Sequence, residues 1–207
     1  MIKDVLELNG ISEDILKELS YKSKLGKSLK QNLHAFARDD LLAELYEVSR
    51  WLNQQEILSD MVLDYRVKSY DSITQKYERY YPNRQVRQVF NDILGFRAFC
   101  DGYEDLLAAG NVSFRVADMS KGKAHDDGYR GVHLYYQPDK FHYPIEIQFN
   151  TLYDRQINNW LHIFLYKKNY PDIIGQKMRE RYEAGDIRSD HDFKDVLRDV
   201  LYTCERY

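Results

Sequence analysis

The apolar residues of this chain recur with a helical period at both ends and with a strand period in the middle. In residues 1–60 they fall three or four positions apart, as on one face of an amphipathic helix. In residues 61–150 they gather in short segments, and in residues 151–207 the helical period returns. A sheet flanked by helices buries both kinds of apolar face. We therefore predict an α+β fold with N-terminal helices, a central sheet and C-terminal helices.

Five segments of the middle stretch are short and rich in β-branched or aromatic residues, which is typical of strands. They span residues 61–67, 93–100, 112–117, 131–137 and 143–149. The last segment alternates Ile145, Ile147 and Phe149 with Glu146 and Gln148, so it has one apolar and one polar face. The helical periods predict helices over 70–80, 102–109 and 29–52.

Composition and length indicate one globular domain with appended helices over residues 1–207, or two small domains at most. A domain has roughly 150 residues, and 43% apolar with 30% charged residues is the balance of a soluble protein. No segment is apolar enough for a membrane helix, and acidic residues near the N-terminus exclude a secretory signal. Cys100 and Cys204 lack metal-ligand spacing, so we expect a reduced, cytoplasmic protein.

Two acidic residues occupy positions where an acid is costly. Asp92 precedes the apolar segment 93–100, and Glu146 lies in the middle of a strand. If those strands are neighbours, the two carboxylates converge on one face, which a bound divalent cation makes tolerable. Oxygen ligands of this kind suit Mg²⁺ with substrate phosphates. The alternative is that Asp92 caps the strand and Glu146 pairs with a surface arginine.

A basic group surrounds the first predicted strand and the helix after it. Arg66 and Lys68 share one strand face, whereas Ser72 and Lys76, four apart, share one helix face. Ser72 falls in the first helical turn, where backbone N–H groups attract anions. Arg97, on the strand after Asp92, could reach the same place. These residues predict a polyphosphate site, and ordinary solvated basic residues are the alternative.

A polar loop, residues 119–128, leads into the sequence Gly-Tyr-Arg-Gly-Val-His at 128–133. Tyr129 stands between glycines, where its ring is free to stack on a nucleobase. His133 could donate a hydrogen bond to a phosphate or hydroxyl, although a lone histidine is more often structural. Elsewhere, residues 21–30 carry four lysines and no acid, which could meet a polyanion although the net charge is −3.

Together these groups resemble the synthetase domain of RelA/SpoT-type alarmone synthetases. The matching stretches are Tyr65–Lys68 with Ser72 and Lys76, Asp92–Arg97, Gly128–His133 and Ile145–Gln148, within about residues 60–170. The resemblance implies a mixed, about five-stranded sheet of nucleotidyltransferase type. It also implies a pyrophosphokinase, in which a 3′-oxygen attacks the β-phosphorus of ATP and AMP is released.

The resemblance further implies roles for single residues. Arg66 and Arg97 would hold the ATP adenine between them, and the ATP phosphates would meet Lys68, Ser72 and Lys76. Mg²⁺ would be held by Asp92 and Glu146, and Glu146 would help to deprotonate the attacking hydroxyl. Tyr129 would stack on the acceptor base, so the catalytic set is Asp92, Glu146 and Tyr129. The acceptor side would be lined by Tyr129, Arg130, His133 and Gln148.

Several positions depart from the family pattern and affect the choice of acceptor. His125 replaces the usual lysine, with Asp126 and Asp127 beside it, and these acids would repel a 5′-polyphosphate. Asn150-Thr151 replaces an Arg-Thr pair, and Arg155 replaces the asparagine of the guanine pocket. These departures resemble the toxic branch of small alarmone synthetases, some members of which pyrophosphorylate the 3′-terminal adenosine of tRNA and are neutralised by an antitoxin protein.

The first hypothesis is therefore a tRNA pyrophosphokinase toxin, cytoplasmic and without membrane contact, that uses ATP and Mg²⁺ and pairs with a cognate antitoxin. Basic residues away from the site would bind the tRNA: Lys22, Lys24, Lys27, Lys30 and Arg115. The second is a (p)ppGpp synthetase with GDP or GTP, or an adenosine nucleotide, as acceptor. The third is an inactive nucleotide- or RNA-binding module.

Overall fold

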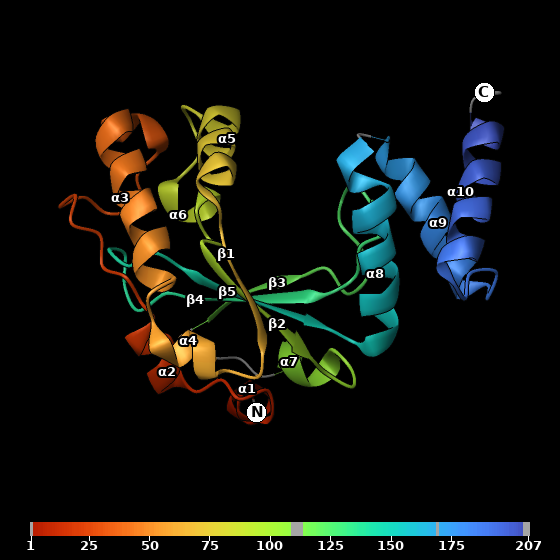
Figure 1. Ribbon diagram of the computed structural model, residues 1–207, viewed down its shortest axis with the longest axis horizontal. Helices are drawn as coiled ribbons and strands as arrows, with labels where there is room; N and C mark the ends of the chain where they lie inside the picture. Colours follow the sequence, from red (N-terminus) through yellow and green to blue (C-terminus); the bar gives the residue numbers. More distant parts are fainter. Residues whose placement is uncertain (1, 109–113, 169, 205–207) are drawn as a thin grey trace. The chain divides into compact units, whose positions relative to one another are not determined.

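The computed structural model describes residues 2–108, 114–168 and 170–204 (Figure 1). The helices are α1 (Ile2–Leu8), α2 (Glu13–Glu18), η1 (Leu33–Ala35), α3 (Arg38–Leu52), α4 (Glu56–Asp60), α5 (Tyr70–Tyr80), α6 (Val86–Val89), α7 (Glu104–Ala108), α8 (Leu152–Phe164), η2 (Tyr166–Lys168), α9 (Asp172–Glu183) and α10 (Asp190–Cys204). The strands are β1 (Asp64–Val67), β2 (Leu94–Phe99), β3 (Phe114–Asp118), β4 (Val132–Tyr136) and β5 (Ile145–Asn150). Residues 109, 112, 113 and 205–207 of the predicted elements lie outside the described part.

The described residues cluster into two compact units. The first unit draws on Met1–Ala98, Glu104–Ala117 and His133–Phe149. The second unit draws on Phe99–Tyr103, Asp118–Val132 and Asn150–Tyr207. The prediction of a single domain over 1–207 stays a prediction.

The sheet has five strands within the described residues, in the order β1-β2-β5-β4-β3. β1 and β2 are antiparallel, with Arg66 opposite Gly95 and Asp64 opposite Arg97. The N–H of Cys100 donates to the carbonyl of Asn150 at 3.2 Å, so the C-terminal ends of β2 and β5 are adjacent and these strands run parallel. The predicted mixed sheet of an α+β fold is confirmed.

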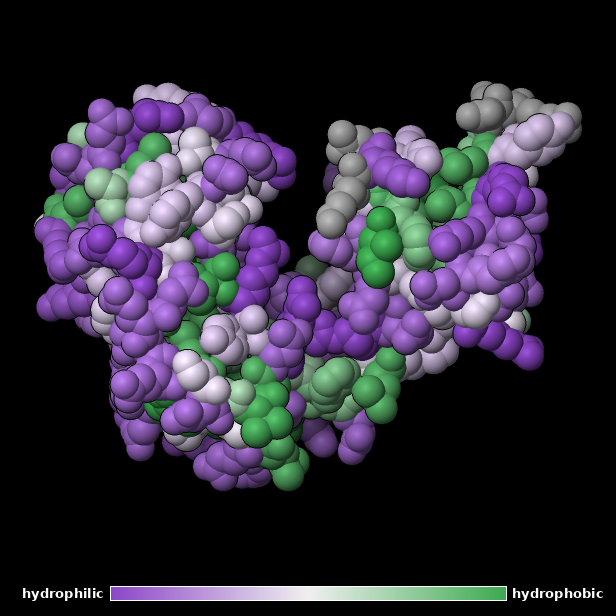
Figure 2. Space-filling model, in the orientation of Figure 1, coloured by the Kyte–Doolittle hydropathy of each residue, from purple (hydrophilic) through white to green (hydrophobic). Residues whose placement is uncertain are grey.

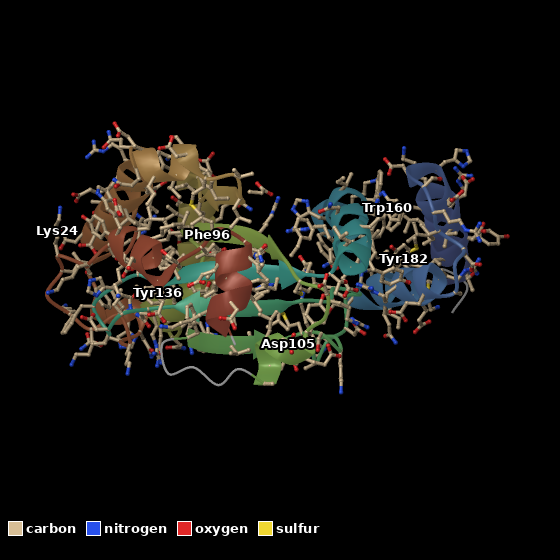
Figure 3. All side chains as sticks on the ribbon, turned by 90° about the horizontal axis from the view of Figure 1, so that it is seen from below. Lys24, Phe96, Asp105, Tyr136, Trp160 and Tyr182 are labelled. Atoms are coloured by element: carbon tan, nitrogen blue, oxygen red, sulfur yellow. The ribbon has the colours of Figure 1, made fainter. Side chains whose placement is uncertain are left out.

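Apolar side chains of the first unit gather against the sheet. Figure 1 shows α3 and α5 on one side of it and α1, α2 and α7 on the other. Phe96 of β2 and Ile147 and Phe149 of β5 are fully buried, and Figure 3 labels Phe96 at the sheet. The alternation that predicted β5 is therefore confirmed, because its apolar positions form the core. On the side drawn in Figure 2, the surface over α3 is mostly hydrophilic.

The long helix predicted over 29–52 is shorter than expected. Residues 29–37 are not α-helical, and α3 begins only at Arg38. Leu29, Leu33 and Phe36 are buried all the same, since their segment is held by backbone bonds to distant residues. The N–H of Leu29 donates to the carbonyl of Lys140, and that of Leu33 to the carbonyl of Arg84. Helical spacing of the leucines therefore reflects burial rather than helix.

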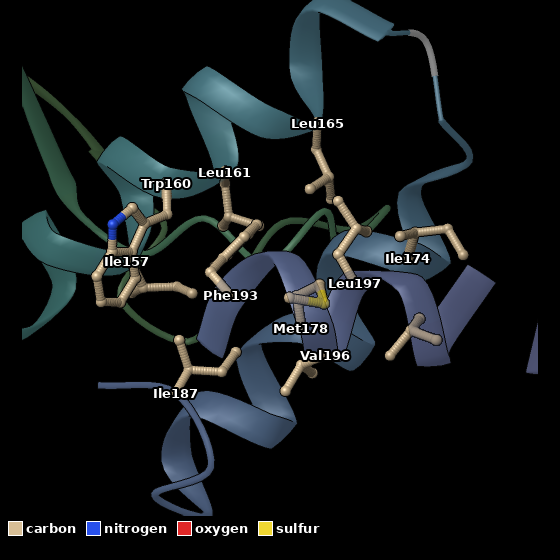
Figure 4. Close-up of a cluster of buried hydrophobic side chains, with 11 residues drawn as sticks. Ile157, Trp160, Leu161, Leu165, Ile174, Met178, Ile187, Phe193, Val196 and Leu197 are labelled. Atoms are coloured by element: carbon tan, nitrogen blue, oxygen red, sulfur yellow. The ribbon is translucent and has the colours of Figure 1, made fainter. Parts of the chain in front are cut away.

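The C-terminal helices α8, α9 and α10 of the second unit share their own hydrophobic core (Figure 4). Trp160 and Leu161 of α8, Met178 of α9, and Phe193 and Leu197 of α10 all point into it. Helix α8 begins where the Thr151 hydroxyl accepts from the N–H of Asp154. Within the described part of the chain, no helix is long and apolar enough to cross a membrane.

Candidate active site

Asp92 lies two residues before β2 and faces two ammonium groups. Lys68, which directly follows β1, places its Nζ 2.6 Å from Asp92 Oδ2. Lys76 of α5 places its Nζ 2.9 Å from the other carboxylate oxygen and also donates to the carbonyl of Val89 at 3.2 Å. The strand-cap alternative for Asp92 is incomplete, because both carboxylate oxygens bind lysines that come from other elements.

Lys68 is buried together with its charge. Its residue is only 6% exposed, and its N–H donates to the carbonyl of Ile93 at 2.8 Å. Burial lowers the pKa of the Lys68 ammonium, and the carboxylate of Asp92 only partly opposes this shift. Lys76 and Arg66 lower the pKa further by like-charge repulsion. The site therefore holds more positive charge than its one aspartate balances.

Glu146 of β5 is buried among three hydrogen-bond donors. Its Oε1 lies 3.0 Å from His133 Nδ1 and 2.9 Å from the Tyr135 hydroxyl, and its Oε2 accepts from Gln148 Nε2 at 2.7 Å. Burial alone would raise the pKa of Glu146, but the bonds from His133, Gln148 and Tyr135 outweigh it and hold the pKa below its ordinary value. An ionised carboxylate only accepts, so Nδ1 of His133 carries a proton.

One surface pocket of the first unit brings both carboxylates together with most of the predicted donor-side residues. It is lined by Arg66, Lys68, Asp92, Gly95, Arg97, Glu146 and Gln148. Gly95 matters because a β-carbon at this position would lie 3.6 Å from Glu146 Oε2. A β-carbon would still fit at this ordinary contact distance, whereas a larger side chain would take up room in the pocket that Gly95 lines. The two carboxylates predicted to converge therefore open into one pocket.

Mg²⁺ fits these residues by donor chemistry. The two carboxylates offer oxygen ligands, which Mg²⁺ prefers. Within residues 2–108, 114–168 and 170–204, no three His, Cys, Asp or Glu side chains come together as a metal site. Among the described residues this pocket offers a pair of acidic ligands, so the remaining coordination positions would fall to water and phosphate oxygens.

The predicted ATP-binding residues surround this pocket in different ways. Arg97 of β2 donates to Asp64 at 3.1 Å, while Arg66 is exposed on the neighbouring strand. Ser72 lies in the first turn of α5, where its hydroxyl accepts from Ser69 at 3.0 Å. Lys76 follows one turn later and reaches Asp92. The first turn of α5 therefore presents a hydroxyl and backbone N–H groups near the site's cations.

Tyr129 and Arg130, predicted on the acceptor side, belong to the second unit. Lys123 Nζ lies 5.0 Å from the centroid of the Tyr129 ring. Arg130 holds Asp126 through two bonds of 2.7 and 2.9 Å, and Lys123 pairs with Asp127 at 2.5 Å. The two acids that were expected to repel a polyphosphate are thus paired with cations close to them in the chain, and the same pairing occupies Lys123 and Arg130.

The four lysines of residues 21–30 are exposed, and two of them have partners. Lys24 pairs with Glu47, and Lys27 donates to the carbonyl of Ala35 at 2.6 Å. Lys22 and Lys30 are exposed as well, and Figure 3 shows Lys24 at the periphery. The buried Glu44 anchors the segment, because it accepts from the Ser23 hydroxyl at 2.7 Å and from the Lys24 N–H at 2.6 Å.

Arg115 of β3, predicted to bind tRNA together with the lysines, contacts an aromatic ring. Its guanidinium lies 3.9 Å from the centroid of the Tyr135 ring, and the Tyr135 hydroxyl donates to Glu146. The sequence interpretation missed Tyr135 and Gly95. Tyr135 could have been found, since it lies two positions after His133 on the same strand face. Gly95 gives a weaker signal, because a glycine inside a strand often marks a close approach.

A comparison with protein families matches residues 65–171 to the region found in RelA / SpoT proteins. That match covers all four predicted motifs and more than half of the chain. A search of curated proteins finds no significant match.

The solved structures similar to this chain include three of low identity. Small alarmone synthetase 1 from Bacillus subtilis is 23% identical, covering 77% of this chain and 93% of that chain at a TM-score of 0.41. Small alarmone synthetase 2 from Bacillus subtilis is 19% identical, and the match covers 84% of this chain and 95% of that chain at a TM-score of 0.41. A GTP pyrophosphokinase family protein from Streptococcus pneumoniae is 20% identical, and the match covers 80% of this chain and 87% of that chain at a TM-score of 0.38.

Proposed function

The chain belongs to the RelA/SpoT family, and from this membership we propose that it moves the pyrophosphoryl group of ATP onto a 3′-hydroxyl. The enzyme class is that of a pyrophosphotransferase. One observation carries the proposal: Asp92 and Glu146 open into one pocket with Arg66, Lys68 and Arg97. Two ionised acids surrounded by cations suit a substrate that brings both a divalent metal and a triphosphate.

The proposed reaction transfers one group and balances without a further reactant. The 3′-oxygen of the acceptor bonds to the β-phosphorus of ATP, the bond from that phosphorus to the α,β-bridging oxygen breaks, and AMP leaves. Mg²⁺ held by Asp92 and Glu146 would neutralise charge on the phosphates. Arg66 and Arg97 would hold the adenine, so that catalysis consists of positioning and charge neutralisation.

Glu146 suits metal binding better than proton abstraction. Its pKa is held below the ordinary value by its three hydrogen-bond donors, and a weaker base removes a proton less effectively near neutral pH. Those same donors fix the orientation of the carboxylate, as partners of metal ligands do. We assign the hydroxyl proton to solvent and the carboxylate to the metal.

For the acceptor, we propose the 3′-terminal adenosine of tRNA, so that the protein would inhibit translation as a toxin with a cognate antitoxin. Support comes from the second unit, where Lys123 and Arg130 are committed to Asp127 and Asp126 and do not offer their charge to a 5′-polyphosphate. The exposed Lys22 and Lys30 offer a separate basic surface for an RNA backbone. Arg130, His133 and Gln148 stay predictions for the acceptor side.

The experiment supplies ATP labelled at the γ-phosphate together with one acceptor at a time: deacylated tRNA, GDP, GTP or ATP. Transfer of label to tRNA, with release of AMP, is the expected result. A tRNA that lacks its terminal adenosine should stay unlabelled and serves as the matched control. Label on GDP or GTP alone would replace the tRNA acceptor by a guanosine nucleotide. Label on no acceptor at all would leave the nucleotide- or RNA-binding module.

A growth assay tests the toxin proposal without a purified acceptor. Expression of the wild-type chain should arrest growth, and Asp92→Ala should relieve the arrest because the enzyme loses a metal ligand. Equal arrest by the Asp92→Ala variant would mean that binding, rather than transfer, inhibits growth. Co-expression of the protein encoded beside the gene should restore growth if it is the antitoxin.

A further inference from the structure

The loop that carries Tyr129 is pressed directly against helix α9. Gly128 has a φ of +86°, and a β-carbon on it would lie 2.3 Å from the carbonyl oxygen of Gly175. A β-carbon on Gly175 would lie 1.9 Å from the carbonyl oxygen of Asp127. Both distances are shorter than any real contact, so backbone meets backbone here. Glycine at 175 is unfavourable inside a helix, which leaves the close approach as its reason.

Arg179, one turn after Gly175 on the same face of α9, holds the loop by a hydrogen bond. The residue is 1% exposed, and its Nε donates to the carbonyl of Gly128 at 2.9 Å. Its guanidinium also bonds Asp154 at 2.6 Å, and Asp154 accepts in turn from the Tyr103 hydroxyl at 2.7 Å. Arg179 is thus oriented by a buried acid of α8 and aimed at the peptide just before Tyr129.

The backbone directly after Tyr129 is also fixed by side-chain hydrogen bonds. Asn158 of α8 accepts from the N–H of Arg130 at 3.3 Å and donates to the carbonyl of Arg130 at 2.7 Å. Asn150 donates to the same carbonyl at 2.8 Å. The backbone on both sides of Tyr129 is therefore fixed by polar side chains of α8 and α9 and by the end of β5.

The contacts that Arg179 and Gly175 make with the loop form a clamp. Stabilising the three helices alone does not require this clamp. A buried ion pair is often replaceable by apolar residues without loss of stability, and α8, α9 and α10 already share an apolar core. What the polar clamp adds is a defined position for the loop. We propose that Arg179 and Gly175 are positioning residues that set the Tyr129 ring for stacking on the acceptor base. This inference rests on the proposed function.

The proposal assigns α9 to the acceptor and not to ATP. The predicted ATP-binding residues lie in the first unit, whereas the clamp and Tyr129 lie in the second. Misplacing an aligned group by about 1 Å can cost up to about 100-fold in rate. Loss of the clamp should thus raise the KM for the acceptor by about tenfold or more, with the KM for ATP within about twofold of wild type.

The test uses the full chain with Arg179→Lys, Arg179→Met and Gly175→Ala, and Glu180→Ala as the matched control on the exposed face of α9. Steady-state transfer from ATP to deacylated tRNA gives both KM values. Amide hydrogen exchange over residues 118–132 reports the anchoring of the loop without any activity. In the clamp variants we expect faster exchange there and a raised KM for tRNA only, both measured below a melting midpoint that is lower than that of wild type because Asp154 loses its partner or α9 must shift. Glu180→Ala should match wild type in every measurement.

Several results would overturn the proposal. An unchanged KM for tRNA in folded Arg179→Met and Gly175→Ala would do so, and so would equal rises in both KM values, because either outcome reduces the clamp to a structural role. If Arg179→Met does not fold, Arg179→Lys serves instead, because it keeps the charge and loses the two bonds of the guanidinium to Gly128 and Asp154. The comparison of the KM for tRNA with the KM for ATP then decides in the same way. If wild type labels no acceptor, the proposed function fails, and hydrogen exchange still shows whether α9 anchors the loop.

Discussion

Replacing Asp92 by asparagine removes the carboxylate that two ammonium groups share. Lys68 and Lys76 lie 2.6 and 2.9 Å from its two oxygens, and the Lys68 side chain is only 7% exposed. Removing one partner of a buried pair costs about 3–5 kcal/mol. Because the side chains of Asp92 and Lys76 are 21% and 26% exposed, water restores part of the loss. We therefore expect the free energy of unfolding to fall by about 3 kcal/mol near neutral pH.

The loss should shrink as the pH rises, and the sign follows from Lys68. Burial already lowers its pKa below the unfolded value, so between the folded and unfolded values the unfolded chain binds more protons and stability rises with pH. Without Asp92, which raises the pKa, the folded value falls further and this window extends to lower pH. At high pH Lys68 is neutral in both proteins, and its demand for a carboxylate disappears.

Urea unfolding followed by circular dichroism measures this difference at about pH 7 and about pH 9.5. The matched control is Asp101→Asn, an aspartate that is exposed and should change stability by less than about 0.5 kcal/mol. A loss below about 1 kcal/mol for Asp92→Asn near neutral pH would refute the idea that this carboxylate balances a buried charge. An equal loss at both pH values would refute the role given to Lys68.

The remaining predictions concern the acid side of the site, the acceptor and the RNA surface. Glu146→Gln should lose less stability than wild type between about pH 6 and about pH 3, because the lowered pKa of Glu146 stabilises the fold above that range and the benefit is lost on protonation; acid titration by circular dichroism measures it. Tyr129→Ala should raise the KM for tRNA by about tenfold or more, corresponding to a stacking loss of about 1–3 kcal/mol, whereas Tyr129→Phe should stay close to wild type. Lys27→Glu with Lys30→Glu should weaken tRNA modification and flatten its salt dependence, with ATP binding unchanged by calorimetry.

Local patterns in the sequence predicted much of the sheet and its polar face. The alternation around Glu146 placed Ile147 and Phe149 in the core, and strand spacing placed Arg66 and Lys68 on one face of β1, where both line the same pocket. These inferences succeed because a strand has a period of two regardless of its partners. The helix over 70–80 was predicted correctly as α5, since its apolar and capping residues are local as well.

Contacts between distant segments could not be predicted in the same way. Leu29 and Leu33 have helical spacing, yet they lie in a non-helical segment held by Lys140 and Arg84. The ion pairs of Asp92 with Lys68 and Lys76 were missed. The sequence interpretation had assigned Asp92 to Mg²⁺ and the two lysines to the ATP phosphates. Gly175 left a faint signal, as a glycine inside a helical pattern. Nothing in the local sequence indicated that Arg179 donates a hydrogen bond to the carbonyl of Gly128.

The pairing of Asp92 with two lysines bears on how the site responds to ATP. Lys68 and Lys76 together bind both oxygens of the Asp92 carboxylate. Triphosphate oxygens would draw these ammonium groups away, and the carboxylate that they leave behind would then need another cation. A metal ion alone would compete with two ammonium groups, whereas ATP alone would leave the half-buried carboxylate of Asp92 without a cation. Each ligand therefore removes the obstacle to the other, and binding of ATP and Mg²⁺ should be positively coupled.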